Sequence, residues 1–115
     1  MVIKAIREKL TAARVRTAVA EFGKKLAAEK IPVKQMILFG SYAKNNPHID
    51  SDIDVAVILK ADSGVDRGGI DNITWWAKQI NVKLEPHVLS EGDFNNRWLS
   101  LPAEIKKSGI KMTDH

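Results

Sequence analysis

Two aspartates at the start of an apolar run are the residues best suited to chemistry in this chain. Asp52 and Asp54 precede VAVIL, which ends at Leu59. Residues i and i+2 of a strand project from one face, so the two carboxylates would lie roughly 6–7 Å apart. At an effective dielectric near 20, two such charges repel by about 2–3 kcal/mol. The pair is therefore either solvated or neutralised by a cation, and Mg²⁺ prefers oxygen ligands of this kind.

A third acid, Glu85, lies on a later segment that alternates apolar and polar residues, VKLEPHVL. The alternation predicts a strand in which Glu85, Lys83 and His87 face away from the core. If this strand neighbours the aspartate strand, three carboxylates meet. Three acids at one edge suit two Mg²⁺ ions about 3.5–4 Å apart, an arrangement used for in-line displacement at phosphorus. Asp52, Asp54 and Glu85 are thus the candidate catalytic residues and metal ligands.

A Gly-Ser turn supplies the other half of the candidate site. Gly40 and Ser41 follow the apolar run MILF. Glycine allows the backbone to approach a phosphate closely, and a helix start at Ser41 would favour anions. Lys44, one turn later, adds a positive charge. The chain has no GxxxxGK[ST] sequence, so this is not a P-loop.

The segment before these residues has the composition of a helix, from Ile3 to Glu29. Its apolar residues form two stripes on nearly opposite sides. Either the helix breaks near Thr11, or one long helix buries its two ends against different surfaces. The second half is expected to pack on the sheet. The first half covers another part of the fold or a second subunit, so a homo-oligomer formed through the N-terminal helix is one expectation.

The remaining segments predict an α/β (α+β) fold with a mixed central sheet. Helices pack mainly on one face, and the acids are open on the other. The predicted strands are 33–39 and 53–59, both central, then 82–89, with a possible short strand at 110–112. Pro86 cannot donate to a ladder, which places its strand at an edge or at a bulge. The predicted later helices are 70–80, one capped by Ser90, and 102–107 ended by Gly109. Phe94, Trp98 and Leu101 are expected to share one face of the helix after Ser90.

Size and composition indicate one domain over residues 1–115, large enough to bury a core. The chain has no cysteine, which excludes disulfides and thiolate metal sites and agrees with a cytoplasmic location. No apolar run is long enough to span a membrane, and the charged N-terminus does not fit a signal peptide. The net charge of +4 suits a polyanionic ligand such as a nucleoside triphosphate. No basic patch interleaved with aromatic residues is present, so nucleic-acid binding is not expected.

The stretch GSYAKNNPHIDSDIDVAVIL resembles the signature of the small prokaryotic minimal nucleotidyltransferases, within the DNA polymerase beta-like superfamily. VKLEPHVLS resembles the strand that carries the family's third carboxylate. The resemblance implies that Gly40 and Ser41 grip the triphosphate and that the three acids bind two Mg²⁺ ions. Asn45 stands where glycine is usual, but asparagine tolerates a positive φ. Lys44 replaces a common arginine, which keeps the charge and loses bidentate geometry.

The resemblance also implies a function. The expected reaction is Mg²⁺-dependent transfer of AMP from ATP to an acceptor hydroxyl. Stand-alone members of this family often act as antitoxins that modify a tyrosine of an all-helical HEPN toxin, so a HEPN protein is the expected partner. Two alternatives remain: a small-molecule nucleotidyltransferase of the aminoglycoside type, and a non-catalytic module that binds the toxin. For His48 and His87, an exposed or supporting position is the simpler interpretation, and contact with substrate is the alternative.

Overall fold

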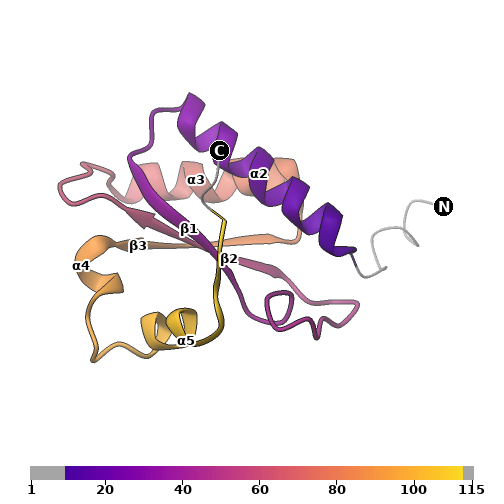
Figure 1. The fold of residues 1–115 in the computed structure, drawn as a ribbon. Helices are drawn as coiled ribbons and strands as arrows, with labels where there is room; N and C mark the ends of the chain where they lie inside the picture. Colours follow the sequence, from indigo (N-terminus) through magenta and orange to yellow (C-terminus); the bar gives the residue numbers. More distant parts are fainter. Residues whose placement is uncertain (1–9, 113–115) are drawn as a thin grey trace.

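The computed structural model describes residues 10–112 as four helices and four strands in the predicted order (Figure 1). The helices are α2 (Ala12–Ala28), α3 (Arg67–Ile80), α4 (Glu91–Phe94) and α5 (Ser100–Ser108). The strands are β1 (Val33–Phe39), β2 (Ile53–Leu59), β3 (Leu84–Ser90) and β4 (Ile110–Lys111). Within these residues, no helix is long and apolar enough to cross a membrane.

The four strands form one mixed sheet in the order β3-β2-β1-β4. β1 pairs antiparallel with both β2 and β4, whereas β2 and β3 run parallel and are joined through α3. The apolar strands β1 and β2 are central, and β3 is at an edge, as its proline predicted. The predicted α+β fold with a mixed sheet is confirmed.

The longer helices among residues 10–112 pack on one face of the sheet, as predicted, and the shorter ones cover part of the opposite face. α2 and α3 lie on one side of the sheet and α4 and α5 on the other (Figure 1). The larger core, under α2 and α3, includes Phe22, Leu26, Ile53 and Ile73. The opposite face has a smaller core of six buried residues: Ile37, Phe39, Ala56, Ile58, Phe94 and Ile105. That second core leaves one end of its face free for polar side chains.

Helix α2 begins where the two apolar stripes of the sequence meet. Thr11 is its N-cap, and its hydroxyl accepts a hydrogen bond from the Arg14 N–H at 3.1 Å. The cap satisfies a backbone donor that a helix start otherwise leaves free. The stripe after Thr11, including Val19 and Phe22, is buried against the sheet. Ile3 and Ile6 lie outside the described residues, so the contact of the first stripe with a second subunit stays a prediction.

Helix α4 is much shorter than the sequence suggested. Ser90 caps it by accepting the Asp93 N–H at 3.0 Å, as predicted. The helix then ends at Phe94, and the Asn96 side chain accepts the Trp98 N–H at 2.9 Å. This local hydrogen bond offers the backbone a turn in place of a further helical turn. The predicted shared face of Phe94, Trp98 and Leu101 is therefore wrong, and Trp98 is 82% exposed.

Glu91 ties three segments together at the α4 end of the sheet. Its carboxylate accepts the Ala61 N–H at 3.1 Å and forms an ion pair with Lys34. The hydrogen bond from Lys34, followed by that from Ala61, holds the pKa of Glu91 below its ordinary value of 4.5. Both donors favour the charged form of the carboxylate. The contact joins the start of β1, the loop after β2 and the start of α4.

Candidate active site

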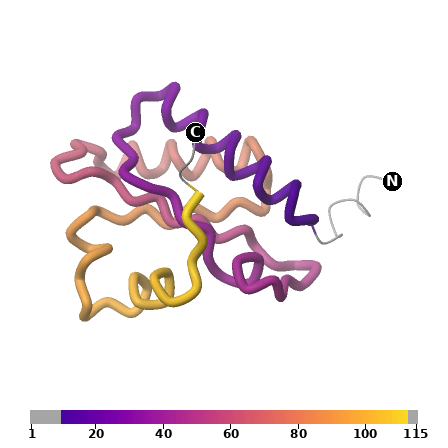
Figure 2. The backbone as a smooth tube through the Cα atoms, viewed as in Figure 1, coloured from indigo at the N-terminus to yellow at the C-terminus, as the bar shows by residue number. Residues whose placement is uncertain are grey.

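The connection between β1 and β2 coils tightly at the end of the sheet opposite α4 (Figure 2). The Lys44 N–H donates to the Gly40 carbonyl at 3.1 Å, and the Asn46 N–H donates to the Ser41 carbonyl at 2.9 Å. Gly40 has φ +76° and Asn45 has φ +56°. Asparagine is among the residues that adopt a left-handed conformation most readily, so Asn45 completes this turn as predicted.

Gly40 lies directly against the side chain of Asp54. A Cβ built on Gly40 would collide with the Asp54 Oδ2 and lie 3.3 Å from its Cβ. Position 40 therefore requires glycine for space as well as for its positive φ. The turn and the second aspartate are in contact, because Phe39 pairs with Asp54 across the β1–β2 ladder. The predicted meeting of the Gly-Ser turn with the aspartate strand is present in the structure.

Ser41 belongs to a small polar network behind the aspartates. Its hydroxyl is 3.2 Å from the Ser51 hydroxyl, which also accepts the His48 N–H at 2.7 Å. The His48 contribution comes from its backbone, and the residue is exposed. The network fixes the loop that leads into Asp52. Ser41 thus has a defined position beside the turn, while His48 is part of the loop scaffold.

Glu85 lies in the same register row as Asp54. β2 and β3 are parallel neighbours, with Asp54 paired to Glu85 and Ala56 paired to His87. Paired residues on adjacent strands project from the same face. Asp52, exposed and two residues before Asp54, comes just before β2 on that same edge. The structure therefore brings the backbone positions of the three acids together.

The two strand acids contact other side chains in this structure. Asp54 Oδ1 is 3.1 Å from His87 Nε2, and Glu85 Oε1 is 3.2 Å from Lys78 Nζ. Within residues 10–112, no three acidic or histidine side chains stand close enough to hold one ion. The backbone gathers the acids, and Glu85 would have to exchange Lys78 for a shared ion.

The donor chemistry of the site fits Mg²⁺. Asp52, Asp54 and Glu85 offer carboxylate oxygens, the ligands this cation prefers. Their side chains remain reachable, because Asp54 is 26% and Glu85 is 40% exposed. Because Gly40 has no side chain, residue 40 does not fill the space beside the Asp54 Oδ2.

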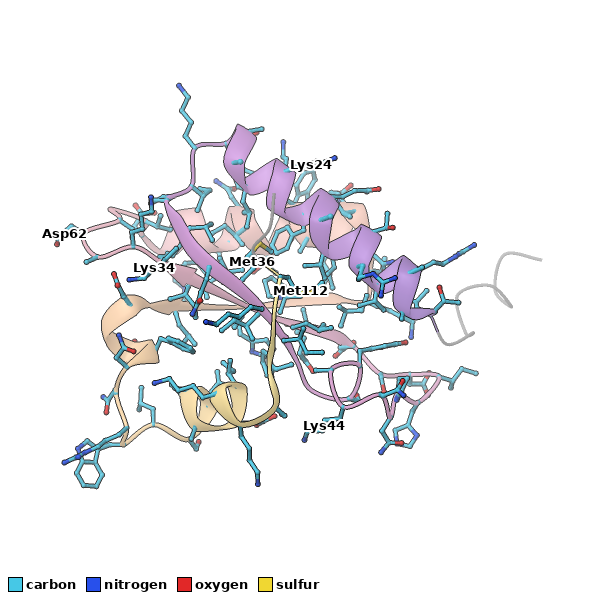
Figure 3. The ribbon with its side chains drawn as sticks, in the orientation of Figure 1. Lys24, Lys34, Met36, Lys44, Asp62 and Met112 are labelled. Atoms are coloured by element: carbon cyan, nitrogen blue, oxygen red, sulfur yellow. The ribbon has the colours of Figure 1, made fainter. Side chains whose placement is uncertain are left out.

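Lys44 is placed less favourably than the sequence suggested. Its side chain is exposed and points outward from the coil (Figure 3). Its role in phosphate binding therefore remains a prediction.

Two lysines near the acids were not singled out as functional candidates in the sequence. Lys83 Nζ donates to the Ile49 carbonyl at 2.7 Å, which holds the loop before Asp52 against the start of β3. Lys78 reaches Glu85 from the last turn of α3. The position of Lys83 could have been inferred from the sequence, because it alternates with apolar residues on the same strand face as Glu85 and His87. The position of Lys78 depends on how α3 packs on the sheet, which hydrophobic periodicity does not specify.

Two cavities of the described residues lie away from the acids. A cavity of about 370 Å³ separates α2 from β1 and is lined by Lys24, Met36 and Met112, among others (Figure 3). A second, of about 180 Å³, lies behind the turn and is lined by Tyr42 and Asn45 among others. Neither is lined by Asp52, Asp54 or Glu85. The acids therefore form an open surface site rather than the floor of either cavity.

Comparison of the sequence with protein families places most of it in one group. Residues 14–111 match the family model described as nucleotidyltransferase domain. The match includes the turn, both aspartates and Glu85. A search of curated proteins found no significant match.

Solved structures of low sequence identity share the fold. A putative nucleotidyltransferase from Sulfolobus solfataricus aligns with a TM-score of 0.60 and 19% identity, over 86% of this chain and 79% of its own. A toxin-antitoxin with AMP-PNP aligns with a TM-score of 0.62 and 18% identity, over 87% and 73%. A mutant of the toxin-antitoxin MntA-HpeT aligns with a TM-score of 0.59 and 18% identity, over 87% and 73%.

Proposed function

Because the chain belongs to the nucleotidyltransferase domain family, we propose that it transfers AMP from ATP to an acceptor hydroxyl with Mg²⁺ bound. One observation carries the proposal. Asp54 pairs in register with Glu85, and its Oδ2 faces the open side of Gly40. A carboxylate pair beside a glycine turn suits a cation held against a phosphate chain.

Each site residue has a defined task in this proposal. Gly40 admits the phosphate chain close to the backbone, and the Ser41 hydroxyl would exchange its contact with Ser51 for a phosphate oxygen. Asp52, Asp54 and Glu85 would hold the cations, which would supply neutralisation of charge on the triphosphate and a lower pKa for the acceptor hydroxyl. The acceptor oxygen forms a bond to the α-phosphorus as the bond to pyrophosphate breaks. In this proposal Glu85, which is 40% exposed on the edge strand, accepts the proton of that hydroxyl.

For the acceptor we propose a tyrosine of a partner protein, a toxin of the all-helical HEPN class. Two structural neighbours support this choice, since they are described as toxin-antitoxin assemblies, one of them with AMP-PNP. The open position of the acids also supports it, because a tyrosine on a large partner reaches a surface site more easily than a deep cavity. In this role the chain neutralises its partner by covalent modification.

Transfer of label from ATP tests the proposal. The protein is incubated with Mg²⁺, ATP labelled at the α-phosphate, and a purified HEPN protein encoded beside it or a lysate of its source cells. The matched control is the double variant Asp52→Asn/Asp54→Asn, with thermal unfolding to verify its fold. Label on a protein tyrosine, lost in the control, supports the proposal. Label on a small molecule instead indicates an aminoglycoside-type enzyme, and no acid-dependent label with any triphosphate indicates a module that only binds.

A further inference from the structure

His87 lies two residues after Glu85 on β3 and projects from the same face of the sheet. Its Nε2 is 3.1 Å from the Asp54 Oδ1, and its ring meets Phe39 edge-on with centroids 5.0 Å apart. Both side chains are partly exposed, His87 by 31% and Asp54 by 26%. Phe39 therefore holds the imidazole ring beside Asp54, one of the metal ligands predicted from the sequence.

The hydrogen bond gives the two oxygens of Asp54 different surroundings. An ionised carboxylate only accepts, so Nε2 carries the hydrogen and donates it to Oδ1. Oδ2 lies on the other side, against Gly40, where any Cβ would collide with it. The hydrogen bond from His87 therefore holds Oδ1 and leaves Oδ2 turned toward Gly40.

We propose that His87 is a positioning residue that orients the Asp54 carboxylate toward a divalent cation at the Gly40 turn. The inference rests on the proposed function, since the cation is the one that this function requires. Hydrogen-bond partners of metal-binding carboxylates orient their ligands, and removing such a partner typically costs 10- to 100-fold in metal affinity or activity. Phe39 contributes by holding the imidazole ring.

Two variants separate the hydrogen bond from the packing of the ring. His87→Phe keeps an aromatic ring beside Phe39 and loses the donor. His87→Gln loses the ring and keeps an N–H that can reach Oδ1. The affinity for Mn²⁺ alone is measured by electron paramagnetic resonance for both variants, the wild type and Asp54→Asn, with thermal unfolding as a check on folding. For the metal-free wild type, long-range ¹⁵N NMR reports which imidazole nitrogen carries the hydrogen.

We expect His87→Phe to bind Mn²⁺ roughly 10- to 100-fold more weakly than the wild type, and His87→Gln to recover most of that loss. The NMR spectrum should show hydrogen on Nε2. Wild-type affinity in His87→Phe, equal loss in both variants, or hydrogen on Nδ1 alone would overturn the positioning role. A wild type that binds Mn²⁺ no better than Asp54→Asn counts instead against the proposed function, so the two failures are distinguishable.

Discussion

Two glutamates only six positions apart, Glu85 and Glu91, each form an ion pair with a lysine, yet their surroundings differ. Glu85 contacts Lys78 at 3.2 Å from an edge strand, and its side chain is 40% exposed. Glu91 pairs with Lys34 and also accepts a backbone N–H from Ala61, and its side chain is 26% exposed. Glu91 therefore links separate parts of the backbone, whereas Glu85 is held by a flexible side chain alone.

The difference indicates how readily the carboxylate at each end of the sheet can leave its partner. A carboxylate bound by a backbone donor cannot leave without breaking local structure, because the N–H would lose its partner. A carboxylate held only by a partly exposed lysine can exchange that partner for a cation at little cost. Asp54 is also held through a side chain, but its Oδ1 contacts a histidine of the neighbouring strand and its Oδ2 faces Gly40. The α4 end thus stabilises the fold, and at the Gly40 end Glu85 can change its partner.

The strongest test of this division replaces one acid at the Gly40 end. Asp54→Asn should lower AMP transfer by about 10²–10³-fold, because the amide lacks the charge that binds the cation, and several kcal/mol of charge stabilisation are at stake. Thermal unfolding should change little. Initial rates with labelled ATP and circular dichroism melting provide the two measurements. A variant that retains the wild-type rate of AMP transfer would contradict a catalytic role for the acids at the Gly40 end.

Gly40→Ala should give the next largest effect, because it affects both the backbone and the aspartate. The positive φ costs an alanine roughly 1–2 kcal/mol, and its Cβ must displace the Asp54 carboxylate. We expect a comparable loss in the free energy of unfolding, measured in urea, together with weaker Mn²⁺ binding. Gly64→Ala is a matched control, since Gly64 also has a positive φ of +74° but has open space around its Cβ position. Equal Mn²⁺ affinity in both variants would contradict the Gly40–Asp54 contact.

Glu91→Gln should destabilise the fold without affecting transfer. The pKa of Glu91 is lower in the folded state, so its contribution is present above its unfolded value and is lost as pH falls through the lowered value. The difference in stability between wild type and variant should therefore be largest near neutral pH and shrink below about pH 4.5. Urea unfolding at pH 7 and pH 3.5 measures this. If the difference in unfolding free energy between wild type and variant grows on acidification, the charge of Glu91 does not stabilise the fold.

Lys78→Met should have the smallest effect and the opposite sign for metal binding. Removing a partly exposed ion pair changes stability by less than about 1 kcal/mol. It also removes a positive charge that competes for Glu85, so Mn²⁺ affinity should rise by roughly 2- to 5-fold at low salt. Metal titration at two ionic strengths provides the measurement. Weaker binding in the variant would show that Lys78 supports the site rather than competes with the cation.

Much of the fold was predictable because its strongest signals are local. The bounds of β1 and β2 agree with the sequence prediction. β1 lies between Pro32 and the Gly-Ser turn, and β2 is an apolar run with polar residues at both ends, so each run leaves little freedom in its bounds. Pro86 correctly indicated an edge strand. The face formed by Phe94, Trp98 and Leu101 was predicted wrongly, because the Asn96 side chain captures a backbone N–H that a helix would have used.

The candidate site was predicted in its backbone and not in its side chains. Alternation along β3 correctly placed Glu85 on the outward face, and parallel pairing then aligned it with Asp54. Which partner each carboxylate contacts depends on the packing of α3 and of Phe39, and both involve residues distant in the sequence. The contacts of Glu85 with Lys78 and of Asp54 with His87 therefore appear only in the structure.

The crossover between β2 and β3 bears on the order in which this site assembles during folding. Gly40 and Asp54 are joined by the shorter connection, residues 40–52, whereas His87 reaches Asp54 only after α3 has docked and the parallel pair has formed. Closing the longer loop costs more entropy, and non-local pairing is slower. A refolding chain is therefore expected to rebuild the Gly40 turn early and to form the contact between His87 and Asp54 in a later kinetic phase.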